Sequence, residues 1–409
     1  MAKILFLTQI VPFPPDAGPK VKTYHVIRAL AGQGHSVTLV SFVRPEEAQY
    51  LSALQPICSA VHAAPIRRSR FADVFYMLKS YLSGRPFLIE RDDLHPMQET
   101  VNRLVQENDF QFIHADQLTM VQFALRGASV VPGKKPKVIF DAHNAVWTIV
   151  ERMKENARFF LKPVLAVEAR RVKQYEGELL RTVDHVLAVT DIDQKLLEEA
   201  LRFSKPNESD RVSPITVIPI AVDTQKLKPV NRKVGSKNIV TLGTLHYPPN
   251  ADGIRWFFNE VFPLVQKRVP DAALTIIGKN PPQDFIELAE RNPGVIKVTG
   301  YVDDLRPYLE ESALMVVPVR AGGGMRVRIL EAFAYAMPVV TTTVGLEGIH
   351  GMPDHDVLVA DTPVDFANRT VELLENASLQ EKLATNGREL ATKKYDWQAA
   401  LSAMRPIYE

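Results

Sequence analysis

The chain has 409 residues, of which 46% are hydrophobic and 23% charged, and its formal net charge at pH 7 is +2. This length suits two or three domains with buried cores, and the nearly balanced charge gives no sign of a nucleic-acid-binding protein. The single cysteine, Cys58, excludes an internal disulfide and a zinc site built from cysteines. The apolar run 4–7 is too short for a signal peptide, and no apolar run reaches about 18 residues, so we expect a soluble cytoplasmic protein.

Short runs rich in Val, Ile, Leu and Phe alternate with helical patterns through the first half of the chain. Such runs are typical of strands in a parallel sheet that carries helices on both faces. They predict a helix at 22–33 and strands at 4–8, 36–42, 112–115, 137–142, 183–190 and 215–218.

The same alternation restarts at residue 238. It predicts strands at 239–245, 273–278, 296–299, 314–319 and 339–342, and helices at 253–268, 285–291, 304–311 and 329–336. Each half is therefore expected to be an α/β domain with a doubly wound sheet. Ligands of such sheets bind beyond the carboxyl ends of the strands, so two facing sheets would frame one cleft.

The stretch 219–237 is polar and basic and contains proline, which makes it a candidate linker. We therefore expect an N-terminal domain at 1–218, a linker at 219–237 and a C-terminal domain at 238–385. The remaining segment, 386–409, has a helical pattern interrupted near 395–397, and we expect it to pack across the two domains.

The most informative stretch is 321–343, AGGGMRVRILEAFAYAMPVVTTT. It contains the glycines Gly322, Gly323 and Gly324, the arginines Arg326 and Arg328, and the carboxylate Glu331. Glycines and arginines before an apolar helix offer backbone N–H groups and guanidinium groups to a phosphate, and a carboxylate on the first turns can accept hydrogen bonds from two sugar hydroxyls. The segment predicts a nucleotide-sugar site. The alternatives are a plain flexible turn and a pair of solvated surface charges.

Several further segments occur in an order that is specific when taken together. They are PFPPDAG at 12–18, AGQGHSV at 31–37, DAHN at 141–144, VIPIAVD at 217–223 and VTGYVDD at 298–304. With the glycine–arginine segment, they make the chain similar to the group 1 glycosyltransferases, retaining enzymes of the GT-B fold. The resemblance covers nearly the whole chain and is strongest at 239–349.

This resemblance implies two Rossmann-like domains facing a cleft and a C-terminal helix that crosses back to the first domain. It also implies transfer of a sugar from a nucleoside-diphosphate donor, of the UDP or GDP type, with no other cofactor and no metal required. The acceptor hydroxyl would belong to a glycan, a lipid-linked molecule or a small molecule, as in polysaccharide biosynthesis.

The chain departs from the family pattern at two places. Gly323 stands where the family has the first of two glutamates eight positions apart, and the stretch 243–250 lacks the usual Arg and Lys. The resemblance is therefore to a branch that has moved its phosphate cations to Arg326 and Arg328.

The resemblance also assigns roles to individual residues. His143 would orient the transferred sugar or stabilise charge, Arg326 would hold the leaving diphosphate, and Glu331 would bind the ribose hydroxyls. The donor-binding set is Gly18, Thr244, Tyr301, Val302, Gly322, Gly323, Gly324, Met325, Arg326, Arg328, Leu330 and Glu331. For His143 the alternative is a structural histidine, and for Gly18 an ordinary turn glycine. For Lys20 and Lys22 the alternatives are contact with a phosphate and a position in solvent, of which we expect the second. We expect Asp141 and Asn144 in turn or cap positions.

Residues 67–81 mix cations with Phe75, Tyr76, Met77 and Leu78. They are either an amphipathic helix in peripheral contact with anionic lipid at the inner membrane surface, or a helix that packs its apolar face on its own domain. Two other functions stay open. Gly323 permits a non-catalytic nucleotide-sugar-binding protein, and a doubly wound fold permits a nicotinamide oxidoreductase, although the proline-rich turn 10–18 lacks the glycine fingerprint of that class.

Overall fold

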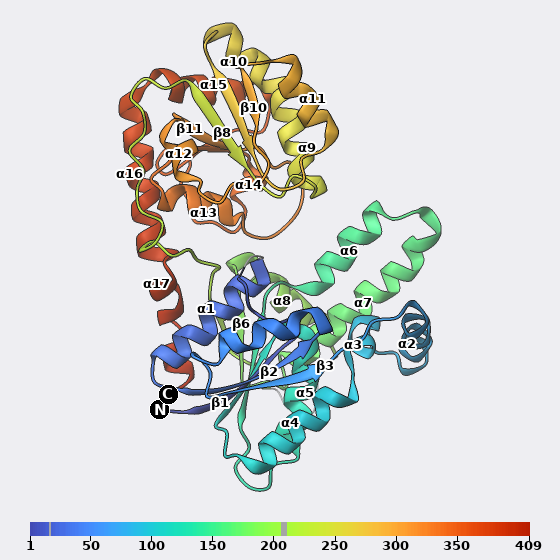
Figure 1. Cartoon of the computed structure of the whole chain (residues 1–409). Helices are drawn as coiled ribbons and strands as arrows, with labels where there is room; N and C mark the ends of the chain where they lie inside the picture. Colours follow the sequence, from blue (N-terminus) through green and yellow to red (C-terminus); the bar gives the residue numbers. More distant parts are fainter. Residues whose placement is uncertain (16–17, 206–210) are drawn as a thin grey trace. The chain divides into compact units, whose positions relative to one another are not determined.

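A computed structural model describes residues 1–15, 18–205 and 211–409. The described chain divides into two compact units (Figure 1). Unit 1 comprises Met1–Pro219 together with Leu401–Glu409, and unit 2 comprises Ile220–Ala400. Each unit has its own hydrophobic core, built of strands and the helices that cover them.

The sheet of unit 1 has seven described strands in the order β3-β2-β1-β4-β5-β6-β7, and every pairing in it is parallel. The strands are β1 (Lys3–Thr8), β2 (Ser36–Val43), β3 (Ala60–Pro65), β4 (Phe112–Asp116), β5 (Lys137–Ala142), β6 (His185–Ala188) and β7 (Ile215–Val217). The order reverses between β1 and β4, as in doubly wound sheets. The predicted parallel sheet is confirmed, and the edge strand β3 was not predicted.

Helices connect the strands of unit 1 and cover its sheet (Figure 1). They are α1 (Gly18–Gly32), η1 (Pro45–Leu54), α2 (Arg70–Ser83), α3 (Phe87–Asp92), α4 (His95–Glu107), α5 (Leu118–Ser129), α6 (Val146–Asn156), η2 (Phe159–Leu161), α7 (Lys162–Leu179) and α8 (Asp191–Phe203). Helix α1 begins four residues before the predicted start, because Pro19 is tolerated in a first turn, where its missing N–H has no intrahelical partner.

The sheet of unit 2 has six described strands in the order β10-β9-β8-β11-β12-β13, again all parallel. The strands are β8 (Asn238–Leu242), β9 (Ala273–Ile277), β10 (Ile296–Val298), β11 (Leu314–Val317), β12 (Val339–Thr341) and β13 (Leu358–Val359). The helices are α9 (Pro248–Trp256), η3 (Phe257–Val261), α10 (Phe262–Arg268), α11 (Gln283–Arg291), α12 (Arg306–Glu310), α13 (Val327–Ala334), α14 (Thr343–Leu346), α15 (Pro363–Glu375) and α16 (Ala377–Lys394).

The predicted helix 253–268 is longer than expected and is not a single α-helix. It starts at Pro248, and the π-helical turn η3 separates α9 from α10. Pro263 has no N–H to donate to the preceding turn, and a wider turn at this point accommodates that loss.

The chain returns to unit 1 at its C-terminus. After α16 the helix stops at Tyr395 and Asp396, and α17 (Trp397–Ser402) and η4 (Arg405–Ile407) follow. Residues 220–237 belong to unit 2, where Thr224 donates a hydrogen bond of 2.6 Å to Asp396. Among the described residues, no helix combines the length and the apolar character needed to cross a bilayer.

Candidate active site

In unit 1, His143 lies directly after β5, at the carboxyl end of the sheet. Its Nε2 donates a hydrogen bond of 2.8 Å to Oδ1 of Asp116, the last residue of β4. The two residues meet because β4 and β5 are adjacent and parallel, with Asp116 in register with Asp141. Asp116 was not predicted as a site residue.

Asp116 is a fully buried carboxylate with three partners. Besides His143, it accepts hydrogen bonds from Thr8 Oγ1 at 3.0 Å and from Thr23 Oγ1 at 3.0 and 3.1 Å. These bonds come from β1 and α1, so the carboxylate is fixed from two sides. A fixed acceptor holds the imidazole ring in one orientation and keeps the proton on Nε2.

Asp141 and Lys22 form a buried ion pair beside His143. Burial by itself would raise the pKa of Asp141, but the charge of Lys22 and a hydrogen bond from His114 outweigh it, so the pKa lies below its ordinary value. The predictions that Lys22 is solvated and that Asp141 is a turn residue are therefore wrong. Lys22 belongs to the core-facing stripe of α1 with Val26 and Ile27, and burial of its charge requires a partner.

The last residues of the chain reach the same polar cluster. The Tyr408 hydroxyl and His114 Nδ1 are hydrogen-bonded at 2.5 Å, and the His114 ring stacks on Phe6 with centroids 4.1 Å apart. Burial raises the pKa of Tyr408 well above its usual value, with the charge of Asp141 adding to the effect. His114, Asp116 and Asp141 could together ligate a metal ion, a grouping that was not predicted. In this structure the Lys22 ammonium already supplies a positive charge there.

In unit 2, the glycine-rich segment forms the loop before α13. Gly322 and Gly324 have φ values of +108° and +84°, which glycine adopts without steric cost. Arg326 is the N-cap residue of α13, and its Nη1 donates to the carbonyl oxygens of Gly323 at 2.7 Å and Gly324 at 2.6 Å. The guanidinium thus holds the loop against the start of the helix.

Arg328 turns inward to the end of β8. Its Nη1 donates to the Leu242 carbonyl at 2.9 Å and its Nη2 to Asn250 Oδ1 at 2.6 Å. Burial and the neighbouring charge of Arg326 lower the pKa of Arg328 to about 10, so it stays cationic at neutral pH. A Cβ at Gly243 would lie 2.6 Å from Arg328 Nη1, so only glycine leaves room for this guanidinium.

Glu331 lies one turn further along α13. Burial raises its pKa, and the charge of Arg328 partly offsets that effect. Within the described parts of the chain, no group donates a hydrogen bond to its carboxylate. A partly buried carboxylate without protein donors can accept hydrogen bonds from the hydroxyls of a ligand.

The other predicted donor residues contribute in different ways. The Thr244 carbonyl accepts from Asn250 Nδ2 at 3.1 Å, while Met325 and Leu330 have buried side chains and can offer a ligand only their backbone. Tyr301 is exposed, and Val302 follows it.

Lys279, two residues after the end of β9, is a neighbour of Tyr301 that was not predicted. Its Nζ lies 4.4 Å from the centroid of the Tyr301 ring. The sequence signal was a cation in Gly278-Lys279-Asn280, immediately beyond a strand.

The structure assigns the predicted residues to the two units. His143 and Gly18 belong to unit 1, and all the others belong to unit 2. Gly18 is the first residue of α1, and a Cβ there would meet no atom within 4 Å. Asp16 and Ala17, part of the motif at 12–18, lie outside the described residues.

Two parallel Rossmann-like sheets followed by C-terminal helices define the GT-B class of fold. Comparison with solved structures supports this fold assignment. Sucrose-phosphate synthase from Thermosynechococcus elongatus superposes with a TM-score of 0.69 at 16% identity, covering 99% of this chain and 98% of that one. Anabaena HepE in complex with UDP and glucose gives a TM-score of 0.65 at 13% identity, covering 100% and 99%.

Family models match both units. The model for glycosyltransferase family 4 matches residues 18–226, about half of the chain, and that for group 1 glycosyl transferases matches 236–376. The chain belongs to this family: it is a retaining glycosyltransferase that uses a nucleotide-sugar donor. The nicotinamide oxidoreductase alternative is thereby excluded. A 44.6 kDa protein in the cps region of Klebsiella pneumoniae is 22% identical over 418 residues, 99% of each chain.

Proposed function

We propose that the loop and first turns of α13 hold the nucleoside-diphosphate part of the donor. Arg326 and Arg328 would neutralise the diphosphate together with the start of the helix, and Glu331 would accept hydrogen bonds from the ribose hydroxyls. The observation that carries this proposal is that one segment holds two guanidinium groups anchored on main-chain carbonyls and one partly buried carboxylate that accepts no hydrogen bond from the described residues.

The proposal includes a relocation of the phosphate cations. Family members often carry Arg and Lys after the first strand of this domain, whereas this chain has Gly243 to Asn250 with neither. The Arg328 guanidinium reaches the carbonyl of Leu242, at the end of that strand. It therefore offers positive charge from α13 at the place where the strand loop lacks it, which supports assignment to a branch without the first glutamate.

In unit 1 we assign His143 to the transferred sugar and Asp116 to the positioning of His143. The 2.8 Å bond between them keeps the Nε2 proton on the carboxylate side, so Nδ1 is the nitrogen left to face a substrate hydroxyl. Its lone pair would accept from that hydroxyl and fix the sugar ring.

The reaction would proceed on the face of the sugar that carries the leaving group. The bond between the anomeric carbon and the phosphate oxygen breaks, and the bond to the acceptor oxygen forms on the same face through an oxocarbenium-like transition state. The acceptor proton passes to the departing phosphate oxygen, so no protein base is required. The two arginines then stabilise charge as it develops on the diphosphate.

The donor class and the acceptor are the finer parts of the proposal. HepE is solved with UDP, so we propose a UDP-sugar in preference to a GDP-sugar. For the acceptor we propose a lipid-linked hydroxyl, reached by peripheral contact of residues 67–81 with the inner membrane surface. The exposed apolar side chains of this segment support it, and a glycan or a small molecule are the alternatives.

The test is a donor panel with matched variants. Wild-type protein is incubated with UDP- and GDP-sugars, and donor hydrolysis is followed together with nucleotide binding by calorimetry. Arg326→Ala is expected to lower turnover and UDP affinity, each by about tenfold or more, because charge-assisted bonds contribute about 1.5–3 kcal/mol. Arg320→Ala is the control, since Arg320 is an exposed neighbour paired with Asp252, and it should change little.

Two outcomes would contradict the proposal. Unchanged turnover in Arg326→Ala would remove the arginine assignment. Nucleotide binding without hydrolysis of any donor would favour the alternative of a degenerate nucleotide-sugar-binding protein, which Gly323 in place of glutamate had suggested.

A further inference from the structure

Helix α2 presents an apolar face to solvent. Phe71 is 89% exposed, and the stripe continues at spacings of three and four residues. Its members are Phe71, Val74, Phe75, Met77, Leu78, Tyr81 and Leu82. Surface helices of globular proteins bury such a stripe. The structure therefore excludes the alternative that this segment packs its apolar face on its own domain.

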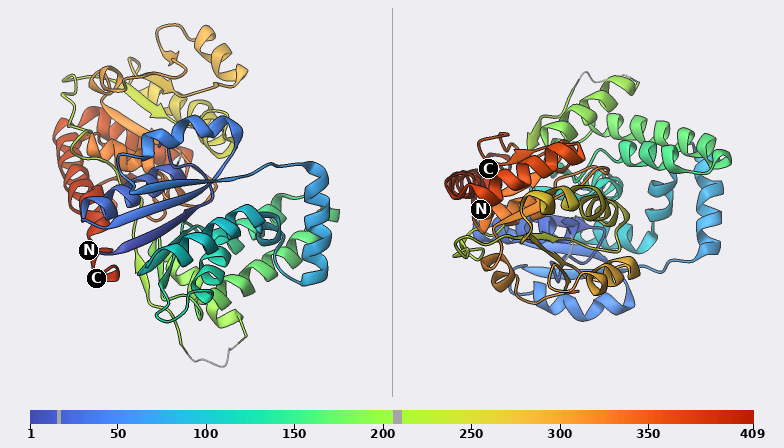
Figure 2. Two further views of the ribbon diagram at one scale, coloured as in Figure 1. Left: turned by 60° about the horizontal axis from the view of Figure 1, so that its bottom comes forward. Right: turned by 90° about the horizontal axis from the view of Figure 1, so that it is seen from above.

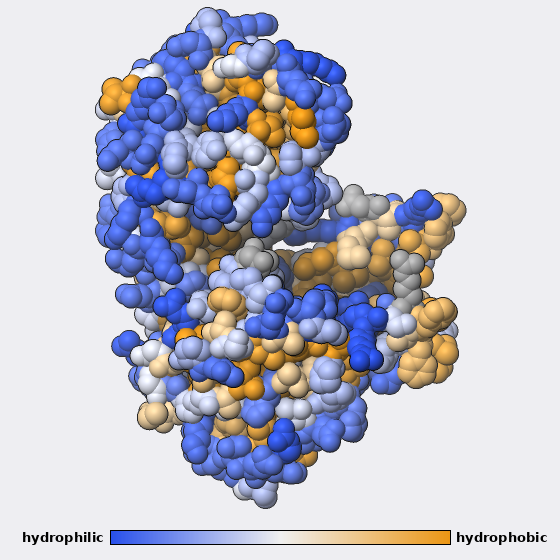
Figure 3. All heavy atoms as spheres, viewed as in Figure 1, coloured by the Kyte–Doolittle hydropathy of each residue, from blue (hydrophilic) through white to orange (hydrophobic). Residues whose placement is uncertain are grey.

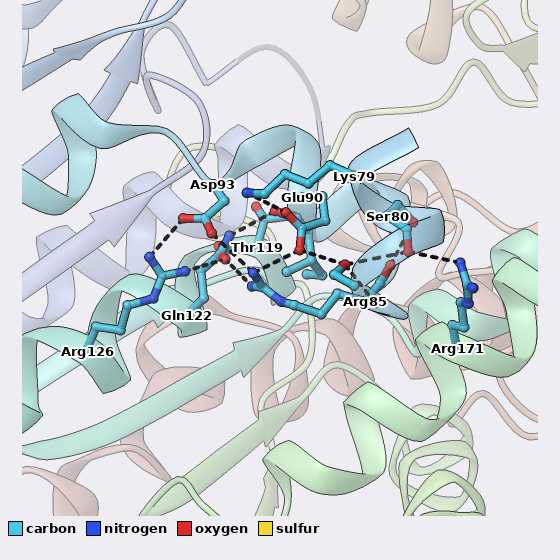
Figure 4. A network of polar contacts seen from close by, with 11 residues as sticks. Lys79, Ser80, Arg85, Glu90, Asp93, Thr119, Gln122, Arg126 and Arg171 are labelled. Atoms are coloured by element: carbon cyan, nitrogen blue, oxygen red, sulfur yellow. Dashed lines mark hydrogen bonds and ion pairs between the residues drawn. The ribbon is translucent and has the colours of Figure 1, made fainter. Parts of the chain in front are cut away.

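The polar face of α2 is held inward by a network of hydrogen bonds and ion pairs (Figure 4). Lys79 pairs with buried Glu90 at 2.7 Å, and Ser80 Oγ donates to the Arg85 carbonyl at 2.7 Å. From α7, Arg171 Nη1 donates to the Ser80 carbonyl at 3.3 Å. These contacts fix the rotation of the helix about its axis.

The network continues into the body of unit 1, which makes that orientation stable. Arg85 pairs with Glu90 at 3.1 Å and Asp93 at 3.2 Å, and Arg126 of α5 pairs with Asp93 at 2.8 Å (Figure 4). Turning the apolar stripe inward would remove Lys79 from the buried Glu90 carboxylate and break the hydrogen bonds of Ser80, which is costly.

A second apolar element lies at the tip of the hairpin formed by α6 and α7. Phe159 is 84% exposed there. The exposed apolar side chains of the tip are Met153, Phe159, Phe160, Leu161, Val164 and Val167. In Figure 1 and in both views of Figure 2, α2 and this tip project on the same side of unit 1. Figure 3 shows apolar side chains gathered over both elements.

Both elements are basic. Residues 67–79 carry four cations against Asp73, and residues 152–167 carry four cations against Glu155. Three of these cations are paired with acids just outside the segments: Arg68 with Asp92, Lys79 with Glu90 and Lys154 with Glu151. The whole chain has only +2, so the rest of the molecule is net acidic. Arg67, Arg158 and Lys162, which flank the apolar side chains, are exposed.

From this combination we propose that α2 and the tip of the α6–α7 hairpin together form a docking surface for an anionic lipid bilayer. Apolar side chains enter the boundary between headgroups and acyl chains, and the flanking cations contact anionic headgroups. The positive charge of both elements favours an anionic bilayer over a second copy of the chain, because a second copy would bring the same positive surface against itself. The inference rests on the peripheral membrane contact in the proposed function and deepens it by adding the tip of the α6–α7 hairpin as a second contact element.

The test is co-sedimentation of the full chain with vesicles, without donor or acceptor, so failure here is distinguishable from failure of the proposed donor site. Phosphatidylcholine vesicles are compared with vesicles containing about one third phosphatidylglycerol. We expect binding to the anionic vesicles that weakens with salt. The double variants Phe71→Ser/Phe75→Ser and Phe159→Ser/Phe160→Ser should each reduce partitioning by about tenfold or more.

The matched control is Val234→Ser, which removes a 96% exposed apolar side chain of unit 2 that is outside the surface. Its partitioning and the thermal melting of all variants should match the wild type, because every altered side chain is exposed. The proposal would be overturned by equal binding to neutral and anionic vesicles, or by no binding to either. It would also be overturned if only one of the two double variants lost vesicle binding. A concentration-dependent dimer abolished by the same substitutions would overturn it as well.

Discussion

Replacement of Asp116 by asparagine tests whether this carboxylate positions His143. The amide oxygen can keep the bonds from Thr8 and Thr23, which share Oδ2, but the amide nitrogen then faces His143 Nε2. The imidazole must move its proton to Nδ1 to pair with the amide, which places a donor where the substrate hydroxyl needs an acceptor. The substitution removes the hydrogen bond between His143 and an ionised carboxylate, and such a bond contributes about 1.5–3 kcal/mol. If the whole loss falls on the transition state, the rate is about 10- to 150-fold lower.

The assay is donor hydrolysis with kcat and KM measured separately. We expect the loss in Asp116→Asn mainly in kcat, with the ¹⁵N resonances of His143 reporting the change of tautomer. Thr8→Val is the control, because it removes a hydroxyl bond to the same carboxylate and leaves the His143 bond in place. A folded Asp116→Asn protein with wild-type kcat, while His143→Ala is impaired, would refute the positioning role.

Further expectations concern stability and the donor loop. Glu176 has a pKa raised to about 8 by burial, against 4.5 ordinarily, so the unfolded chain releases this proton first and stability should fall as pH rises from about 4.5 to 8. Glu176→Gln should flatten that decline in urea unfolding. Lys22→Met should lower the free energy of unfolding by about 3–5 kcal/mol, because it leaves the Asp141 charge buried without a partner. Adding Asp141→Asn to this variant should restore much of that free energy in the same urea unfolding measurement. Gly243→Ala must displace the guanidinium behind it and should weaken UDP binding about tenfold in calorimetry, whereas Gly32→Ala, with open space around it, should not.

The central strands and their order of alternation could be predicted because buried parallel strands are almost continuous apolar runs. Strand β5 was predicted with its observed bounds. Two of the four edge strands, β3 and β13, were not predicted because they lack this pattern: β3 is AVHAAP and half-exposed, and β13 has only two residues. Their extended conformation depends on a neighbouring strand and not on their own composition.

The donor segment could be predicted because its residues are consecutive in the chain. The cluster around His143 could not, because its members are brought together by the sheet: Asp116 precedes His143 by 27 residues, and Tyr408 is 294 residues from His114. Lys22 did carry a local signal, since it precedes Val26 by four residues on the buried stripe of α1. A charge on such a stripe indicates a buried ion pair, although only the fold identifies Asp141 as the partner.

Hydrogen exchange of the full chain with saturating UDP tests the central claim most directly, because it reports backbone contact independently of turnover. Slower exchange of amides in residues 322–331, where the glycine loop meets α13, is the expected result. Saturated binding of UDP with unchanged exchange in this segment would contradict the account.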